Sequence, residues 1–161
     1  MKKRLIFTLC ALCMLALAAC GAKAPGVDEP GAHIANPFVD YDTLDEAFSA
    51  AGFDLTAPTS IDGFDAPHIQ LMSGKMLQLI FTGGDQRLVI RKAAGHDDIS
   101  GDYNSYAETK TARVNGADVT LKGTDGKVST AVWCAGGYSY AVLSDTPMAS
   151  DIMTDLIAEI A

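Results

Sequence analysis

The sequence is short of positive charge and of aromatic residues. It has 12 Lys and Arg residues against 20 Asp and Glu, a formal net charge of −8 at pH 7, and 7% aromatic residues. Three of the basic residues are Lys2, Lys3 and Arg4, and without them the formal net charge is −11. A chain of this charge is not expected to bind nucleic acid. It is also repelled by anionic lipid headgroups.

Cysteine is scarce where it could form disulfides. Of the four cysteines, Cys10 and Cys13 lie in a leader that we expect to be removed, and Cys20 follows that leader directly. Cys134 then remains alone, so we expect no intramolecular disulfide in the mature protein. A single cysteine in a β-rich segment favours a small buried hydrophobic side chain over a nucleophile.

Motifs of enzyme active sites are missing from the sequence. It has no Gly-x-Ser-x-Gly elbow, phosphate-binding loop or dinucleotide fingerprint. His33, His68 and His96 lack the close spacing of zinc ligands. A dyad of His96 and Cys134 is the one alternative for a hydrolase or thiol enzyme, and no spacing supports it. We therefore expect a protein that is not an enzyme and has no cofactor.

The first twenty residues have the anatomy of a lipoprotein signal peptide. A cationic start precedes an uncharged apolar run over residues 5–19, which is shorter than the roughly 20 residues that span a bilayer. The run ends in Leu17-Ala18-Ala19-Cys20-Gly21, which looks like a lipobox. We expect cleavage before Cys20, lipidation of that cysteine, and attachment to the extracytoplasmic face of the cell membrane. An ordinary secretory signal with an incidental Cys20 is the alternative.

The rest of the chain divides into a linker and one domain. Residues 21–36 are rich in Ala, Gly and Pro without hydrophobic periodicity, which is typical of a flexible tether after the lipidated Cys20. Residues 37–161 are enough for one domain and too few for two.

Periodic patterns predict an α+β fold in which two helices flank an antiparallel β-meander of about six to seven strands. Thr43 with Glu46 three residues later, and Gly52 after the apolar positions, predict a short N-terminal helix. Thr146-Pro147 predicts the start of a C-terminal amphipathic helix, whose apolar stripe is Ile152, Met153, Leu156 and Ile160. Alternating runs between turn residues predict strands over residues 67–73, 75–82, 86–93, 109–114, 117–122, 128–135 and 138–144.

Two-residue turns predict the faces of the last four strands. The register then places Arg113 opposite Asp118, Val119 opposite Val132, and Trp133 opposite Tyr140. One face is aliphatic and is expected in the core: Ala112, Val114, Val119, Leu121, Val132, Cys134, Ala141 and Leu143. The other carries Arg113, Asp118, Thr120, Lys122, Trp133, Tyr138, Tyr140 and Val142.

The aromatic residues of the second face form a candidate binding surface. Trp133, Tyr138 and Tyr140 stand among polar residues there, and exposed aromatics in such surroundings are common in recognition sites. The alternative is that these rings pack in the core. A shift of one residue in the register would exchange the two faces.

A polar loop over residues 96–106 is the candidate metal site. Asp97, Asp98 and Asp102 supply the hard oxygen ligands that calcium prefers, although their spacing is not that of an EF-hand. The alternative is that the Asp and Asn side chains shape a turn by bonding their own backbone, with Tyr103 and Tyr106 as anchors. A calcium-responsive sensor is therefore an alternative function.

Several segments of the chain together form a recognisable pattern. They are Asn36-Pro37, Leu44-Asp45-Glu46-Ala47, Ala51-Gly52-Phe53, Ile90-Arg91-Lys92, residues 98–106, Trp133 and Gly137-Tyr138-Ser139-Tyr140. This pattern resembles an uncharacterised domain family of bacterial lipoproteins. Related domains look as if they also occur on membrane-anchored regulators similar to anti-sigma factors, which implies sensing or partner binding and gives no catalytic residues. We expect a module that binds an envelope ligand or protein.

Overall fold

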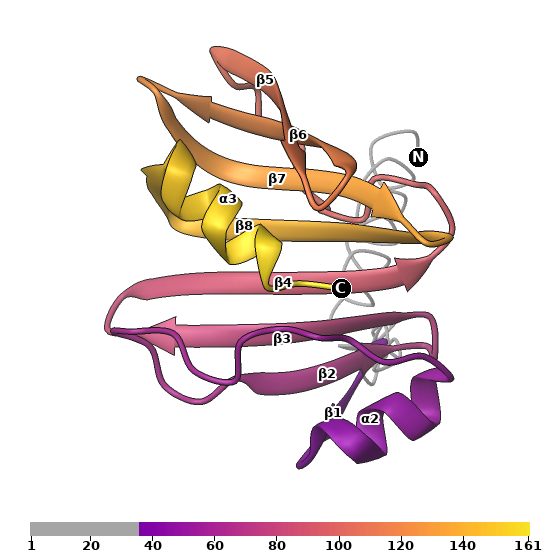
Figure 1. Ribbon diagram of the computed structural model, residues 1–161. Helices are drawn as coiled ribbons and strands as arrows, with labels where there is room; N and C mark the ends of the chain where they lie inside the picture. The colour runs from indigo at the N-terminus through magenta and orange to yellow at the C-terminus, as the bar shows by residue number, and fades with distance from the viewer. Residues whose placement is uncertain (1–35) are drawn as a thin grey trace, which may run out of the picture. The chain divides into compact units, whose positions relative to one another are not determined.

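One antiparallel sheet of eight strands forms the body of residues 36–161, the part of the chain that this computed structural model describes (Figure 1). The predicted antiparallel α+β class is confirmed, with eight strands instead of six to seven. Lipidation at Cys20 lies outside the described residues. The strands are β1 (Phe38–Tyr41), β2 (His68–Met72), β3 (Met76–Gly83), β4 (Gln86–Ala94), β5 (Glu108–Val114), β6 (Ala117–Thr124), β7 (Lys127–Ala135) and β8 (Tyr138–Ala149).

The sheet consists of two meanders joined in the middle. Its strand order is β1-β2-β3-β4-β8-β7-β6-β5, and β4 pairs with β8 from Leu88↔Ser144 to Ala94↔Tyr138. The chain therefore leaves β4 at the centre of the sheet and starts β5 at its far edge. Residues 95–107, which we name the crossover loop, make this passage, and they contain the predicted polar loop.

Both helices lie on the same face of the sheet (Figure 1). α2 (Leu44–Ala51) has the predicted boundaries, because the Thr43 hydroxyl accepts a hydrogen bond from the Glu46 amide at 3.3 Å and Gly52 ends the helix with φ 76°. α3 (Ser150–Ala158) begins later than predicted. Thr146-Pro147 belongs to β8, which continues past the proline and pairs again at Val128↔Met148.

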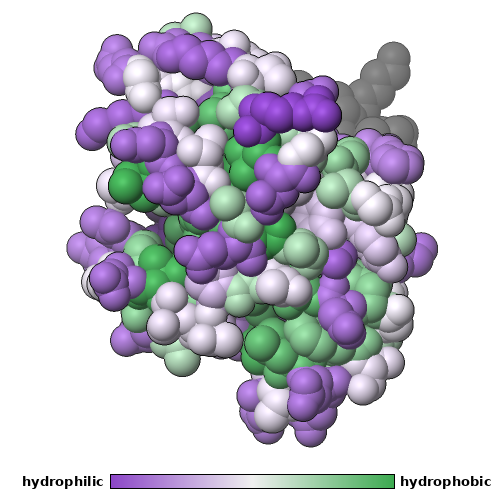
Figure 2. Space-filling model, in the orientation of Figure 1, coloured by the Kyte–Doolittle hydropathy of each residue, from purple (hydrophilic) through white to green (hydrophobic). Residues whose placement is uncertain are grey.

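The helices bury small apolar faces against the sheet. α2 contributes Ala47, and the C-terminal helical region contributes Met153, Ile157 and Ile160. Ile152 is 56% exposed, so its place in the predicted apolar stripe is wrong. Figure 2 views this helix-covered face and shows apolar side chains gathered next to α2. Neither helix of residues 36–161 has the length and apolar content needed to cross a membrane.

A β-bulge in β7 exchanges the two predicted faces of β7 and β8. Lys122 pairs with Thr130 and Gly123 with Val128, so Ser129 is an extra residue on β7. One extra residue turns all later side chains of the strand to the opposite face relative to β6. The strands approach closely at this point, where only glycine fits. A Cβ on Gly123 would lie 1.8 Å from the Lys127 carbonyl oxygen.

The predicted core face is therefore correct for β5 and β6 and wrong beyond the bulge. Arg113↔Asp118 and Trp133↔Tyr140 pair as expected, but Val132 pairs with Thr120 instead of Val119. The core side of β7 and β8 carries Ala131, Trp133, Tyr140 and Val142. The four residues predicted for the core there, which lie on the other face, are Val132, Cys134, Ala141 and Leu143.

Candidate functional site

The crossover loop lies across the face of the sheet that the helices leave free. Four side chains of that face hold it: Arg91 on β4, Lys122 on β6, Thr130 on β7 and Ser139 on β8. Each of these residues is adjacent in sequence to a residue of the core (Ile90, Leu121, Ala131 and Tyr140), so its side chain points away from the helices. The loop is thus fixed to the sheet along its length by side chains from four strands.

Arg91 is the first of these contacts. Its Nη1 donates to the carbonyl oxygens of Ile99, at 3.2 Å, and Ser100, and its Nε donates to Gln78 Oε1 at 3.0 Å. Gln78 in turn donates to Gln70 at 2.6 Å, and the two residues are directly opposite each other in the sheet. The row of side chains fixes the plane of the guanidinium group, so that it meets the loop in one orientation.

Asp102 is the second contact. Its carboxylate accepts hydrogen bonds from the Asn104 amide at 3.0 Å, the Tyr106 hydroxyl at 2.7 Å and the Thr130 hydroxyl. Burial raises the pKa of Asp102, but the bonds from Thr130, Tyr106 and Asn104 outweigh burial and lower the pKa to about 2. The side chain is a structural carboxylate that ties the loop to β7.

Asp98 makes the third contact, with Lys122. Its carboxylate accepts from the Ser100 amide at 2.9 Å and from Lys122 Nζ at 3.0 Å. Burial raises the pKa of Asp98, and the bonds from Ser100 and Lys122 lower it further than burial raises it. Within residues 36–161 no three His, Cys, Asp or Glu residues are arranged to hold a metal ion. The calcium site predicted at Asp97, Asp98 and Asp102 is therefore not supported.

Tyr103 stands out at the tip of the crossover loop. Its side chain is 97% exposed, compared with 55% for Val39 and 56% for Ile152, the other exposed large hydrophobic residues of the described chain. Its neighbours Asp102 and Asn104 bond to each other at 2.8 Å. In the alternative to a calcium site, both Tyr103 and Tyr106 were expected to anchor the loop. Only Tyr106 does so, and Tyr103 points into solvent.

The three aromatic residues proposed as an exposed binding surface lie on the core side of the sheet. Trp133 is 7% and Tyr140 5% exposed, and their rings stack with centroids 5.1 Å apart. The Tyr138 ring contacts Phe53 at 5.4 Å and lies 4.6 Å from Lys92 Nζ. The prediction of an open aromatic face is wrong, because the bulge at Ser129 turns these rings under the helices.

Two grooves lie beside the crossover loop. The first, of about 590 Å³, brings His96 and Asp97 together with Cys134. Cys134 is exposed, which contradicts its predicted burial, and its sulfur lies 3.7 Å from Ser139 Oγ. No hydrogen bond joins His96 to Cys134 in the described part of the chain, so a thiol dyad gains no support. The second groove, of about 510 Å³, contains Arg87 and Arg91.

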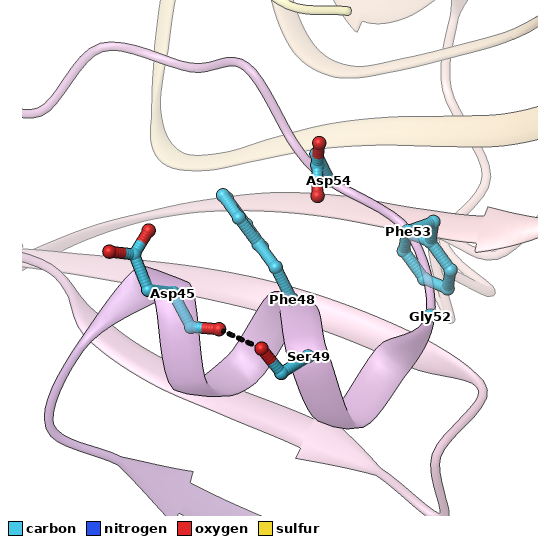
Figure 3. Close-up of a pocket in the computed structure, with 6 residues that line it drawn as sticks. All are labelled: Asp45, Phe48, Ser49, Gly52, Phe53 and Asp54. Carbon is cyan, nitrogen blue, oxygen red and sulfur yellow. Dashed lines mark hydrogen bonds between the residues drawn. The ribbon is translucent and has the colours of Figure 1, made fainter.

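A third hollow, of about 620 Å³, lies on the surface of α2 (Figure 3). Figure 3 shows Phe48 rising from the helix between Asp45 and Asp54. The only hydroxyl among its lining residues, on Ser49, donates to the Asp45 carbonyl oxygen at 2.8 Å. The hollow therefore offers two aromatic rings and two carboxylates.

Comparison with known proteins adds no family to this geometry. No family model, curated protein or solved structure matches the chain. The resemblance to a lipoprotein domain family stays a prediction. The function has to be argued from the crossover loop and the grooves beside it.

Replacing Asp102 by Asn is expected to lower the free energy of unfolding at pH 7 by about 1–2 kcal/mol, because bonds to a partly screened carboxylate are lost. The folded-state pKa of about 2 lies below the ordinary value of 3.8, so the carboxylate stabilises the fold above pH 3.8. This stabilisation is lost between about pH 4 and pH 2. Urea titrations at pH 7 and pH 2 measure both effects.

The matched control is Asp97→Asn, which removes an exposed carboxylate of the same loop. It should unfold at the urea concentration of the wild type at both pH values. Equal urea midpoints for Asp102→Asn and Asp97→Asn at pH 7 would show that the contacts of Asp102 do not stabilise the fold.

Proposed function

We propose that the protein is a lipid-anchored, non-enzymatic binding module on the extracytoplasmic face of the membrane, and that the crossover loop is its recognition element. The observation that carries the proposal is the side chain of Tyr103, which is 97% exposed in a loop held by Arg91, Lys122 and Thr130. The lipid on Cys20 would supply attachment, and residues 21–36 would supply reach.

The physical support is that Tyr103 is both exposed and held in position. A Tyr side chain offers a large amphipathic contact surface with two rotatable bonds, so ordering it on binding costs little entropy. Tyr is also among the residues that contribute most to binding energy at protein interfaces. The contacts of Asp102 and Arg91 order the loop before any partner arrives, which lowers the entropy that binding has to overcome.

The test is site-specific photocrosslinking in intact cells. A photoreactive phenylalanine analogue in place of Tyr103 should give one discrete crosslinked product. The matched control places the same analogue at Lys75, which is exposed in the turn between β2 and β3. Tyr103→Ala should not change the thermal stability of the domain, because a surface substitution without contacts is nearly neutral. When the photoreactive analogue is placed at a neighbouring position of the crossover loop, adding Tyr103→Ala should lower the yield of the crosslinked product with the same partner.

Two results would count against the proposal. One is a cell extract in which the analogue at position 103 gives no product. The other is an identical set of products from positions 103 and 75, because crosslinking would then report only on exposure.

A further inference from the structure

The second groove beside the crossover loop contains a positive charge that the described protein does not neutralise. Arg91 forms no ion pair with any carboxylate of residues 36–161, although its neighbours bury it in part. Its hydrogen bonds are to neutral acceptors, namely Gln78 and the carbonyl oxygens of Ile99 and Ser100. Burying a charge without an opposite charge costs free energy that a bound counter-charge would recover.

A second guanidinium group faces the same groove. Arg87 and Arg91 are four residues apart on β4 and point to the same side of the sheet. Burial, and then the charge of Arg87, lower the pKa of Arg91. Such a lowering by a like charge means that the two cations repel each other, so an anion bound between them would be attracted to both.

The N–H donors of Arg91 are already oriented to bind an anion. Nε and Nη1 are engaged with Gln78 and the loop, whereas Nη2 makes no hydrogen bond in the described residues. A guanidinium group whose plane is fixed loses little freedom when its remaining N–H groups bind an oxyanion. Neutral polar side chains also line the groove, among them Asn104, Ser129 and Thr130.

Two carboxylates also line the groove, and their placement matters. Asp102 is engaged by Thr130, Tyr106 and Asn104, so its charge is offset by donors. Asp145 is 52% exposed at its side chain, and its Oδ2 is 3.6 Å from Arg87 Nε. This is longer than a hydrogen bond, and exposed pairs of this kind are weak. An incoming anion can therefore compete with Asp145 for Arg87.

We infer that this groove binds a small soluble ligand through a phosphate or carboxylate group held by Arg87 and Arg91. Its volume of about 510 Å³ is within the range of small-molecule sites. A soluble ligand fits better than a lipid headgroup, because a mature chain with a formal charge of −11 is repelled by an anionic bilayer surface. The inference deepens the proposed function, because the same loop forms one wall of the groove.

The test is isothermal titration of the full lipidated chain, in nonionic detergent, with inorganic phosphate and with citrate. Arg87→Gln should weaken binding of the preferred probe about tenfold, because one charge-assisted contact is lost. Asp145→Asn should strengthen it roughly threefold, because Arg87 is released and a repelling charge disappears. Neither variant should change the urea midpoint, since both side chains are more than half exposed.

The matched control is Arg113→Gln, which removes the same charge from the same face of the sheet outside this groove. It should leave binding unchanged. Absence of saturable binding for both probes would overturn the inference, and so would equal weakening by Arg87→Gln and Arg113→Gln. These outcomes are separate from the crosslinking at Tyr103, which reads capture of a partner in cells and needs no small anion.

Discussion

Replacing Trp133 by Ala is expected to lower the free energy of unfolding by about 3–5 kcal/mol. The side chain is 7% exposed, stacks on Tyr140 with an angle of 6° between the rings, and borders a pocket formed with Ile157 and Ile160. Removing it leaves a cavity between the sheet and the C-terminal region that neighbouring side chains cannot fill. Domains of this size are stable by only about 5–15 kcal/mol, so a large part of the stability would be lost.

Cys134→Ala is the matched control for Trp133→Ala. Cys134 is the next residue on β7, points to the opposite face and is exposed, so its truncation should change the free energy of unfolding by less than about 0.5 kcal/mol. Urea denaturation followed by circular dichroism measures both variants. If Cys134→Ala proved costly and Trp133→Ala neutral, the bulge at Ser129 would be absent and the original register of the strands would be correct.

The parts of the fold that depend on residues close together in the sequence could be predicted. The cap at Thr43 and the stop at Gly52 act within a few residues, and they set α2 as expected. Seven of the eight strands were expected within a few residues, because two-residue turns such as Asn115-Gly116 mark their ends. β1 was missed, because its four residues, Phe38-Val39-Asp40-Tyr41, do not alternate between apolar and polar types.

The faces of β7 and β8 could not be predicted, because a bulge leaves a weak signal in the sequence. Val128, Ser129 and Thr130 contain no glycine or proline that would mark a bulge, and only their pairing with β6 shows that Ser129 is extra. The bulge then decides whether Trp133 is core or surface. The local signal of Thr146-Pro147 was also overridden, since pairing of β8 with β7 continues at Met148.

The candidate site depends on contacts between residues far apart in the chain. Thr130 donates a hydrogen bond to Asp102, 28 residues earlier in the sequence, and Lys122 donates one to Asp98, 24 residues earlier. The sequence identified the loop as unusual from its carboxylates and offered two interpretations of them, a calcium site and a turn shaped by side-chain bonds to the backbone. It could not show that protein donors already occupy Asp98 and Asp102, nor that the order of the strands places Arg87 beside the same loop.

Replacing Cys20 by Ser, behind an ordinary cleavable signal in place of residues 1–19, is expected to remove the protein from the membrane fraction. The proposed function requires an anchor, and a formal charge of −11 gives the remainder of the chain no electrostatic attraction to lipid. Two acyl chains on one residue bind durably, because each buried methylene contributes about 0.8 kcal/mol. Labelling with radioactive palmitate and fractionation of cells after an alkaline wash measure lipidation and attachment separately.

Membrane attachment through the lipid has to be distinguished from attachment through the apolar leader that precedes Cys20. An uncleaved run over residues 5–19 could itself hold a Cys20→Ser chain, so the variant is made with an ordinary cleavable signal in place of residues 1–19. That chain should carry no palmitate and be found in the soluble fraction. Cys13→Ser is the matched control, because it removes a thiol from the leader and should keep both label and attachment. A soluble Cys13→Ser chain, or a membrane-bound Cys20→Ser chain behind the replaced signal, contradicts attachment through Cys20.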